Sequence, residues 1–459
     1  MEQEGFVVGV SLGTSNVIGL LGRRNEQGVI SILASESIPS ESCVRHGIVY
    51  NIDEAAGKVK KLLSLLENKV GKKIGKVYVS LAGMSLRSLE HIVTKNFGME
   101  TAITYAMLDQ MEQQARTNKF SLLSTYSVVS PEIYLDGNLE EDPIDKQATT
   151  VEARYRIIAG RPNMKSNLAR AISERSQIEI AGYIIGPVAT GAILLGEEEK
   201  NAGCVLVDFG GGTTTVSIYK NGLLRNMTVI PFGGRTITRD VQSLGFAEDV
   251  AETYKIRYGR VGKSKAKTGT EQNAIKADPS LDLRELNKVI QLRQEEIVLN
   301  VIHQINESEY NGQLEAGIFI TGGASQMNGL LEYLAEKSKM QVQMAGIKRL
   351  YINNATDLLQ NPSFSQCLGV MLFAKENCEK VEAPRFERRS QFEYQQHQPR
   401  PVQPETKETT PNKPEPEEKK AEDKNIKENK DKDPKKNPTL FDFFGKIQNI
   451  GGAMFKDEE

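Results

Sequence analysis

The sequence of 459 residues has no tryptophan, only four cysteines and four histidines, and no long apolar run. Its cysteines, Cys43, Cys204, Cys367 and Cys378, are scattered without a CxxC pair, which favours reduced thiols over a disulfide framework or a metal site. No apolar stretch approaches the roughly 20 residues that span a bilayer, and no signal peptide is recognisable at the N-terminus. A formal net charge of −2 gives no reason to expect a nucleic-acid partner. These absences predict a cytoplasmic protein of more than one domain.

The most informative stretch is Val205–Gly222, where a short apolar run ends at Asp208 and three glycines and three threonines follow. We predict a β-hairpin whose first turn leaves backbone N–H groups open to phosphate oxygens, because glycine has no Cβ and tolerates positive φ. Asp208 is placed to meet a phosphate-bound Mg²⁺, directly or through water. Alone, the pattern also suits an ordinary glycine-rich turn. The predicted contact residues here are Gly210, Gly211, Gly212, Thr213 and Thr214.

The same plan of strand and glycine turn occurs twice more. Val7–Leu21 contains an apolar strand, a polar turn and a second strand, and Ile318–Gly329 is a third strand that runs into a double glycine. Two phosphate hairpins and a third glycine turn fit one nucleotide held between two related lobes. The contact residues predicted in these turns are Gly13, Thr14, Ser15, Asn16, Gly322, Gly323 and Ala324.

With these turns the chain resembles the actin, Hsp70 and sugar-kinase superfamily and, within it, the FtsA family of bacterial cell division proteins. The similarity runs from about Gly5 to Cys378, with a matching tail at the C-terminus. The most specific segments are VYVSLAGMSL (77–86), VLVDFGGGTTTVSIYKNG (205–222), VIPFGGRTITRD (229–240), AETYKIRYG (251–259) and IFITGGASQMNGL (318–330). The resemblance implies an α/β, actin-like two-lobed ATPase fold that binds ATP and Mg²⁺, with an inserted 1C subdomain, a disordered linker and a C-terminal amphipathic helix.

The order of the predicted elements and the resemblance together divide the chain. Subdomain 1A takes residues 5–83 and 159–201, the inserted subdomain 1C 84–158, subdomain 2A 202–235 and 308–378, and subdomain 2B 236–307, followed by a linker over 379–438 and a helix over 439–456. An amphipathic helix over Asp53–Val70, with strands before and after it, favours an α/β lobe. The resemblance implies that subdomain 1C serves self-association and contacts with other division proteins; a purely structural insertion is the alternative.

A further candidate site lies where the second lobe continues. Gly233 and Gly234 precede a predicted helix over Arg235–Ser243, whose free N–H groups suit an anion. Glu252 and Lys255 are three residues apart and therefore share one face of the next helix. In the superfamily such a pair contacts the sugar and base of the nucleoside, and the resemblance gives it that role here.

The long helix predicted over Arg284–Glu307 carries a polar side around Arg293 and Glu296. This side resembles the part of subdomain 2B in FtsA that receives the C-terminal peptide of FtsZ, the division tubulin. Exposed charges on a helix are also commonly only solvated, so both interpretations stay open.

Three positions are unfavourable for hydrolysis. The resemblance places Ser11 where actin-like proteins usually have an acidic residue near the metal, Thr215 where an aspartate commonly follows GGGTT, and Gly186 where Hsp70 carries the glutamate that positions the attacking water. A hydroxyl orients water but is no base at neutral pH. We therefore expect Mg²⁺-dependent ATP binding with very slow turnover.

After Cys378 the composition turns to Glu, Lys, Pro, Gln and Asn, which cannot bury enough surface to fold and predicts a flexible linker. In the final segment, winding the chain at about 100° per residue gathers the apolar side chains on one face. We interpret this segment as an interfacial helix lying in a membrane surface, as FtsA proteins carry, with a partner-docking helix as the alternative. The membrane-facing residues are Leu440, Phe443, Phe444, Ile447, Ile450, Met454 and Phe455.

The function expected from these features is that of an ATP-binding, actin-like division protein. It would form a homopolymer on the cytoplasmic face of the inner membrane at the division site, bind lipid and the FtsZ C-terminal peptide, anchor the Z ring and help recruit later division proteins. A small-molecule kinase of the same fold would instead need a catalytic base in the first lobe. A chaperone ATPase would need a peptide-binding domain, and a pilus-assembly relative of FtsA remains a further alternative.

Overall fold

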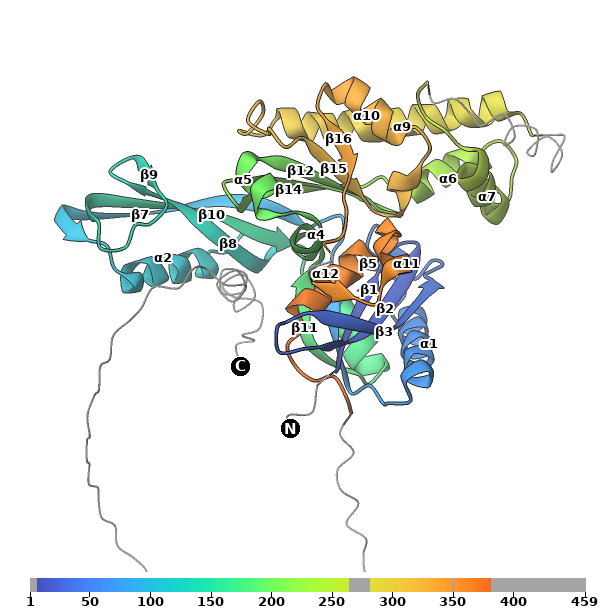
Figure 1. Cartoon of the computed structure of the whole chain (residues 1–459), viewed down its shortest axis with the longest axis horizontal. Helices are drawn as coiled ribbons and strands as arrows, with labels where there is room; N and C mark the ends of the chain where they lie inside the picture. The colour runs from blue at the N-terminus through green and yellow to red at the C-terminus, as the bar shows by residue number, and fades with distance from the viewer. Residues whose placement is uncertain (1–5, 264–280, 349–350, 381–459) are drawn as a thin grey trace, which may run out of the picture. The chain divides into compact units, whose positions relative to one another are not determined.

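The structure, a computed structural model, describes residues 6–263, 281–348 and 351–380. These residues form two α/β lobes and a separate four-stranded sheet (Figure 1). The predicted mixed α/β fold is therefore confirmed. From residue 381 onward, the predicted linker and the predicted terminal helix lie outside the described residues.

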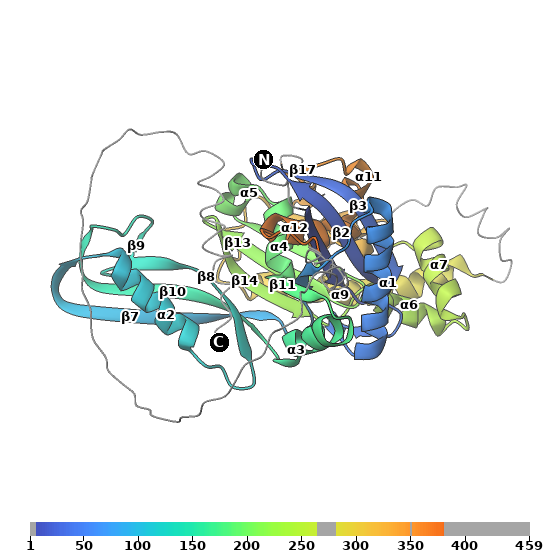
Figure 2. The same cartoon turned by 90° about the horizontal axis from the view of Figure 1, so that it is seen from below.

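The first lobe is built on a six-stranded sheet in the order β11-β6-β1-β2-β3-β17. Helix α1 covers one face along β2 and β3 (Figure 2), and α12 covers the other face. The strands are β1 (Phe6–Leu12), β2 (Asn16–Arg24), β3 (Ile30–Pro39), β6 (Lys76–Leu81), β11 (Glu179–Ile185) and β17 (Ile352–Asn353), with the small pair β4 (Val44–Arg45) and β5 (Ile48–Val49) beside them. The helices are α1 (Ile52–Val70), α3 (Asn163–Ala169), α4 (Gly186–Leu194), α5 (Glu197–Ala202) and α12 (Ser365–Phe373), and α3 continues into π-helical turns over Arg170–Arg175.

Helix α1 shows why these residues fold as they do. The side chain of Asn51 accepts the N–H of Glu54 and caps its start, and Gly71, at φ 73°, ends it in the left-handed conformation. Its buried face carries apolar side chains at helical spacing, among them Val59, Leu62 and Leu66. Burying each such side chain stabilises the lobe by about 1.5–3 kcal/mol. The helix predicted over these residues is confirmed.

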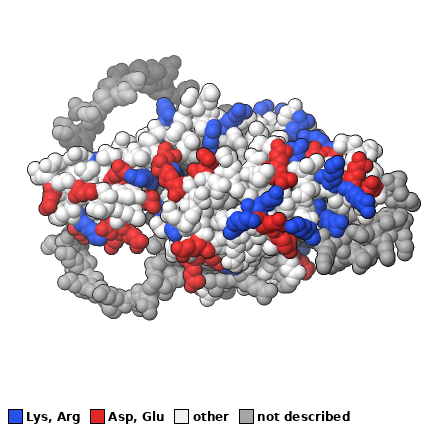
Figure 3. All heavy atoms as spheres, turned by 90° about the horizontal axis from the view of Figure 1, so that it is seen from above, with Lys and Arg blue, Asp and Glu red and all other residues white. Residues whose placement is uncertain are grey.

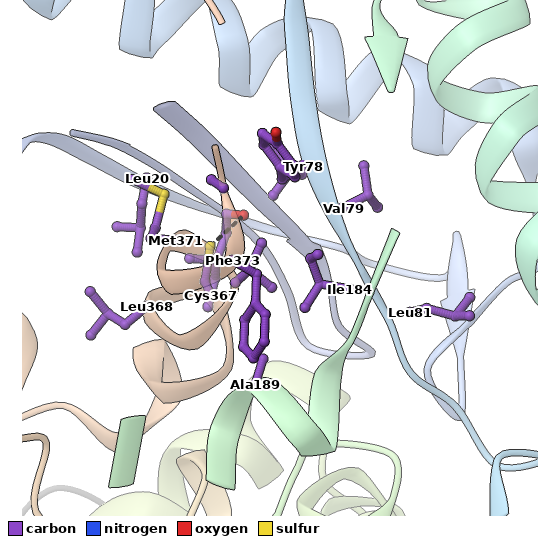
Figure 4. Close-up of a cluster of buried hydrophobic side chains, with 14 of the residues drawn as sticks. Leu20, Tyr78, Val79, Leu81, Ile184, Ala189, Cys367, Leu368, Met371 and Phe373 are labelled. Atoms are coloured by element: carbon purple, nitrogen blue, oxygen red, sulfur yellow. Dashed lines mark hydrogen bonds between the residues drawn. The ribbon is translucent and has the colours of Figure 1, made fainter. Parts of the chain in front are cut away.

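The assignment of residues 308–378 to the second lobe is wrong in its last part. Strand β17 pairs with β3, and α12 packs against β1, β2 and β6, so the chain returns to the first lobe. Figure 4 shows Cys367 and Met371 of α12 among side chains of the first-lobe sheet, such as Leu20 and Tyr78. Burial of the apolar face of α12 drives this return, which no local pattern in the sequence reveals. The linker boundary is also two residues early, because Glu379 bridges to Ile74.

The predicted insertion folds as a sheet of its own, in the order β7-β10-β8-β9, with α2 packed against it. Its apolar interior centres on Tyr155 and Ile157, which are almost completely buried. A buried ion pair joins this sheet to the second lobe: Arg225 Nη2 lies 2.7 Å from Glu132 Oε1. The elements are β7 (Arg87–Ala102), α2 (Tyr105–Thr117), β8 (Ser124–Leu135), β9 (Asn138–Glu140) and β10 (Gln147–Gly160).

The second lobe contains a five-stranded sheet in the order β14-β13-β12-β15-β16. Helices α9 and α10 lie along one side of this sheet (Figure 1), and α4 and α5 contact it through β13. The strands are β12 (Cys204–Phe209), β13 (Thr214–Lys220), β14 (Leu223–Ile230), β15 (Ile318–Thr321) and β16 (Val342–Met344). The helices are α6 (Gly234–Gln242), α7 (Glu248–Tyr258), α9 (Leu283–Asn306) and α10 (Leu330–Ser338). Helix α11 (Thr356–Leu359), which follows β17, packs against the first-lobe core.

Acidic and basic side chains are interspersed over the face seen in Figure 3. Within the described ranges, no helix is both long and apolar enough to cross a membrane.

Candidate functional site

The two glycine hairpins face each other across the gap between the lobes. Each turn is closed by the same bond: the N–H of Gly13 donates to Asn16 O and that of Gly210 to Thr213 O, both at 2.9 Å. A Cβ on Gly211 would meet the hydroxyl of Ser15, so the two turns approach each other closely here. The prediction that the hairpins share one crevice agrees with this geometry.

The hairpins open into a cavity of about 710 Å³ that both lobes line. This volume lies within the range of small-molecule and cofactor sites. The predicted contact residues that line it are Gly13, Thr14, Ser15, Asn16, Asp208, Gly210, Gly211, Gly212, Thr213, Gly234, Glu252, Lys255, Gly322, Gly323 and Ala324. The third glycine turn therefore joins the two hairpins around one space.

Asp208 is the second-last residue of β12 and lines the cavity beside the third glycine turn. A Cβ on Gly322, which has φ 87°, would overlap the Asp208 carboxylate, so the close approach of the two turns requires a glycine there. Burial raises the pKa of Asp208 from 3.8 to about 6. Burial makes the ionised form of Asp208 unfavourable, and a bound cation would stabilise that form. The position of Asp208 therefore suits a site that receives a cation.

Mg²⁺ is usually held by one or two carboxylates together with substrate phosphates and waters, and not by a protein cage. Among the residues that the structure describes, no group of three or more His, Cys, Asp or Glu side chains could hold a metal. The single carboxylate of Asp208 next to two glycine turns fits a phosphate-bound Mg²⁺ and does not fit a metal held by protein ligands alone.

Two predicted contact residues lie elsewhere. The side chain of Thr214 is fully buried and donates to Phe232 O at 2.9 Å, because successive residues of β13 face opposite sides of the sheet. Thr215, on the other side, lines the cavity in its place. Gly233 packs against the backbone of the hairpin at Gly210 and does not line the cavity.

The start of α6 was expected to offer free N–H groups to an anion, and this is wrong for its first residues. The N–H of Gly234 donates to Gly210 O at 3.0 Å, and the N–H of Arg235 donates to Gly211 O at 2.7 Å. The start of α6 therefore holds the backbone of the second hairpin in place.

Glu252 and Lys255 form an ion pair on α7, with Nζ 2.7 Å from Oε2. The same ammonium group also donates to Gly234 O and to the hydroxyl of Thr238, so all three of its N–H donors have protein acceptors. Burial lowers the pKa of Lys255. The pair lines the cavity, and its rigid hydrogen bonding favours a role in shaping the wall.

Arg293 lies near the middle of α9 and does not line the cavity. Its guanidinium pairs with Asp240 at 2.5 Å and with Glu296, and it lies over the ring of Phe232. These partners use much of its hydrogen-bonding capacity within the chain. The FtsZ contact predicted for Arg293 and Glu296 stays a prediction.

Several residues around the cavity were not predicted. Arg235 reaches from α6 to the first lobe, where its Nη1 donates to Glu41 O at 2.7 Å and to Thr14 O at 3.2 Å. His46 Nδ1 lies 2.9 Å from Gly212 O and joins the lobes at a second point. Gln366 enters the cavity from α12. These contacts join segments that are distant in sequence, so no local motif could have indicated them.

Comparison with known proteins agrees with this picture. The family model of the cell division protein FtsA matches residues 205–369. The chain is 29% identical to FtsA of Porphyromonas gingivalis over 361 residues, covering 76% of this chain and 75% of that protein. It is 27% identical to FtsA of Escherichia coli over 394 residues, covering 81% and 91%.

A solved structure, the PilM–PilN type IV pilus biogenesis complex, has a chain that shares the fold with a TM-score of 0.57 at 17% identity, covering 81% of this chain and 98% of that one. This likeness concerns the fold alone, whereas the sequence relatives named above are division proteins. In sequence the chain is therefore similar to FtsA cell division proteins over most of its length.

Proposed function

We propose that the chain binds ATP with Mg²⁺ in the cavity between its lobes. The observation that carries this proposal is the meeting of two glycine hairpins from different lobes across one space, with Asp208 at its edge. The hairpins at Gly13–Asn16 and Gly210–Thr213 would hold the phosphates, and Asp208 would meet the metal. Bound Mg²⁺ would neutralise phosphate charge, and the cross-lobe bonds of Arg235 would hold the closed arrangement.

Equilibrium binding of a fluorescent ATP analogue to the full chain, with and without Mg²⁺, tests this proposal. We expect saturable binding that Mg²⁺ strengthens and that Asp208→Asn makes insensitive to Mg²⁺. Binding that does not respond to Gly212→Ala would contradict it, because a Cβ there would overlap the Thr14 hydroxyl and force the hairpins apart.

We further propose that ATP turnover is very slow. The cavity has two carboxylates among its described lining residues, and one of them, Glu252, is already paired with Lys255 and bonded by Thr238. The first-lobe residues that line it include no carboxylate and no histidine, although a small-molecule kinase would need a base there. Turnover at the roughly 10 s⁻¹ of a median enzyme would contradict this part.

The cellular role that we propose is self-association at the division site on the cytoplasmic face of the inner membrane, with FtsZ and other division proteins as partners. The relatives named for cell division support it, and so does the apolar face predicted for residues 439–456. One short helix binds lipid weakly, whereas an ATP-bound polymer that presents many helices would bind by avidity.

Deleting residues 439–459 should abolish sedimentation with liposomes while ATP binding remains. A truncated protein that still sediments with vesicles would rule out the anchor. Co-sedimentation of FtsZ with the intact chain on vesicles separates the division role from that of a pilus-assembly protein of the same fold.

A further inference from the structure

Gln366 is the one polar, half-buried side chain in an otherwise buried stretch of α12. Cys367, Leu368 and the residues that follow them pack into the first-lobe core, so their apolar character is explained by packing. Packing does not explain Gln366, whose side chain instead lines the cavity between the hairpins. A flexible amide held at such a place suggests a ligand-directed role.

Ser11 fixes the orientation of this amide. Its hydroxyl, almost fully buried at the end of β1, donates to Gln366 Oε1 at 3.2 Å. The amide nitrogen must then lie on the other side, and it lies against Gly186 at the start of α4. Among the described residues, this nitrogen makes no hydrogen bond.

The amide of Gln366 occupies the space that a side chain at position 186 would enter. A Cβ on Gly186 would overlap Gln366 Nε2 and would lie 2.7 Å from Ser80 Oγ. Ser80 Oγ is itself buried without a hydrogen-bond partner in the described part of the chain. The space that a side chain at position 186 would take is therefore filled by Gln366 from the neighbouring helix α12, next to an unsatisfied hydroxyl.

We propose that Gln366 supplies the polar group that position 186 lacks, by donating its amide N–H to the terminal phosphate of a bound nucleoside triphosphate or to the water beside it. Position 186 is where the superfamily resemblance places a water-positioning glutamate. The inference rests on the proposed nucleotide binding and makes Gln366 the residue that distinguishes a triphosphate from a diphosphate.

An amide suits this place better than a carboxylate. Asp208 already brings one negative charge to the cavity, and a second carboxylate close to phosphate oxygens would be repelled. A glutamine orients the attacking water in other nucleotide hydrolases, but it cannot take a proton from that water. An amide in place of a carboxylate would therefore account both for the preference for the triphosphate and for slow turnover.

The test is competition of ATP and of ADP against a fluorescent nucleotide on the full chain, with Mg²⁺ present. For Gln366→Ala we expect ATP affinity to fall about ten- to a hundredfold, the range of one hydrogen bond to a charged group. ADP affinity should stay within about twofold, since the diphosphate lacks the contacted group. Gln366→Glu keeps the size and the Ser11 bond and should lose more ATP affinity than the alanine variant.

The exposed Gln360 provides a matched control, and Gln360→Ala should leave both affinities unchanged. The double variant Gly186→Gln with Gln366→Ala returns an amide from the neighbouring helix α4 and should recover the preference for ATP. An unchanged ratio of ATP to ADP affinity in Gln366→Ala, or an equal loss of both, would overturn the inference while leaving nucleotide binding intact. Failure of the wild-type chain to bind either nucleotide would instead overturn the proposed function and this inference with it.

Discussion

Replacing Asp208 with asparagine is expected to stabilise the nucleotide-free protein while removing its response to Mg²⁺. Burial raises the pKa of this carboxyl from 3.8 to about 6, and a difference of that size corresponds to about 3 kcal/mol. Because the side chain faces a cavity that admits water, the realised penalty is smaller. We expect the variant to gain about 1–2 kcal/mol in free energy of unfolding near neutral or higher pH.

The dependence on pH identifies the cause. The folded-state pKa lies above the unfolded value, so ionisation of Asp208 destabilises the fold. Well below pH 3.8 the carboxyl is protonated in both states, and the variant should match the wild type. The difference should grow from there to about pH 6 and stay nearly constant at higher pH. Urea unfolding followed by circular dichroism measures this, since the chain has no tryptophan.

An exposed aspartate on α2, Asp109, provides the control, because Asp109→Asn should give no such difference. With ATP and Mg²⁺ added, the wild type should become more stable than Asp208→Asn, because ligand binding stabilises the wild type more than the variant. Equal stability of Asp208→Asn and wild type at high pH would refute the reasoning.

Three other substitutions test contacts between distant segments. Arg225→Ala should cost about 3 kcal/mol of stability by removing the cation beside the largely buried carboxylate of Glu132. Arg225→Met combined with Glu132→Leu should recover most of this loss, and additive losses in urea unfolding would contradict the reasoning. Arg235→Ala should speed nucleotide release about fivefold or more by removing two cross-lobe hydrogen bonds, and an unchanged rate in stopped-flow release would argue against its role. Gly322→Ala should destabilise by more than about 2 kcal/mol through its positive φ and its overlap with Asp208, while Gly57→Ala in the open part of α1 should stabilise by up to about 1 kcal/mol.

Local patterns predicted the parts of the fold that depend on local interactions. The glycine turns and their flanking strands follow from residues next to each other in sequence, and the apolar spacing of α1 follows from one helix face. The side of the sheet on which Thr214 lies is set by the register of β13 after the turn, which the sequence does not define. The first-lobe position of α12 and the hydrogen bonds at the start of α6 depend on partners more than 20 residues away, so no window of sequence contains them.

The same distant partners decide what the site can do. The second hairpin is joined to α6 by backbone hydrogen bonds, and its strand β12 pairs with β15, which leads into the third glycine turn, so the backbone holds the second-lobe wall together before any ligand enters. Across the gap, the lobes are joined by Arg235 and His46 at exposed or half-buried points that solvent can replace. Away from the cavity the lobes share a buried apolar core that includes Leu206 and Tyr219 of the second-lobe sheet. Movement of the lobes is therefore expected at the side of the hairpins, where few bonds cross the gap. A nucleotide that contacts both walls therefore changes the spacing of the lobes more than the shape of either, and this is the change that an assembly switch requires.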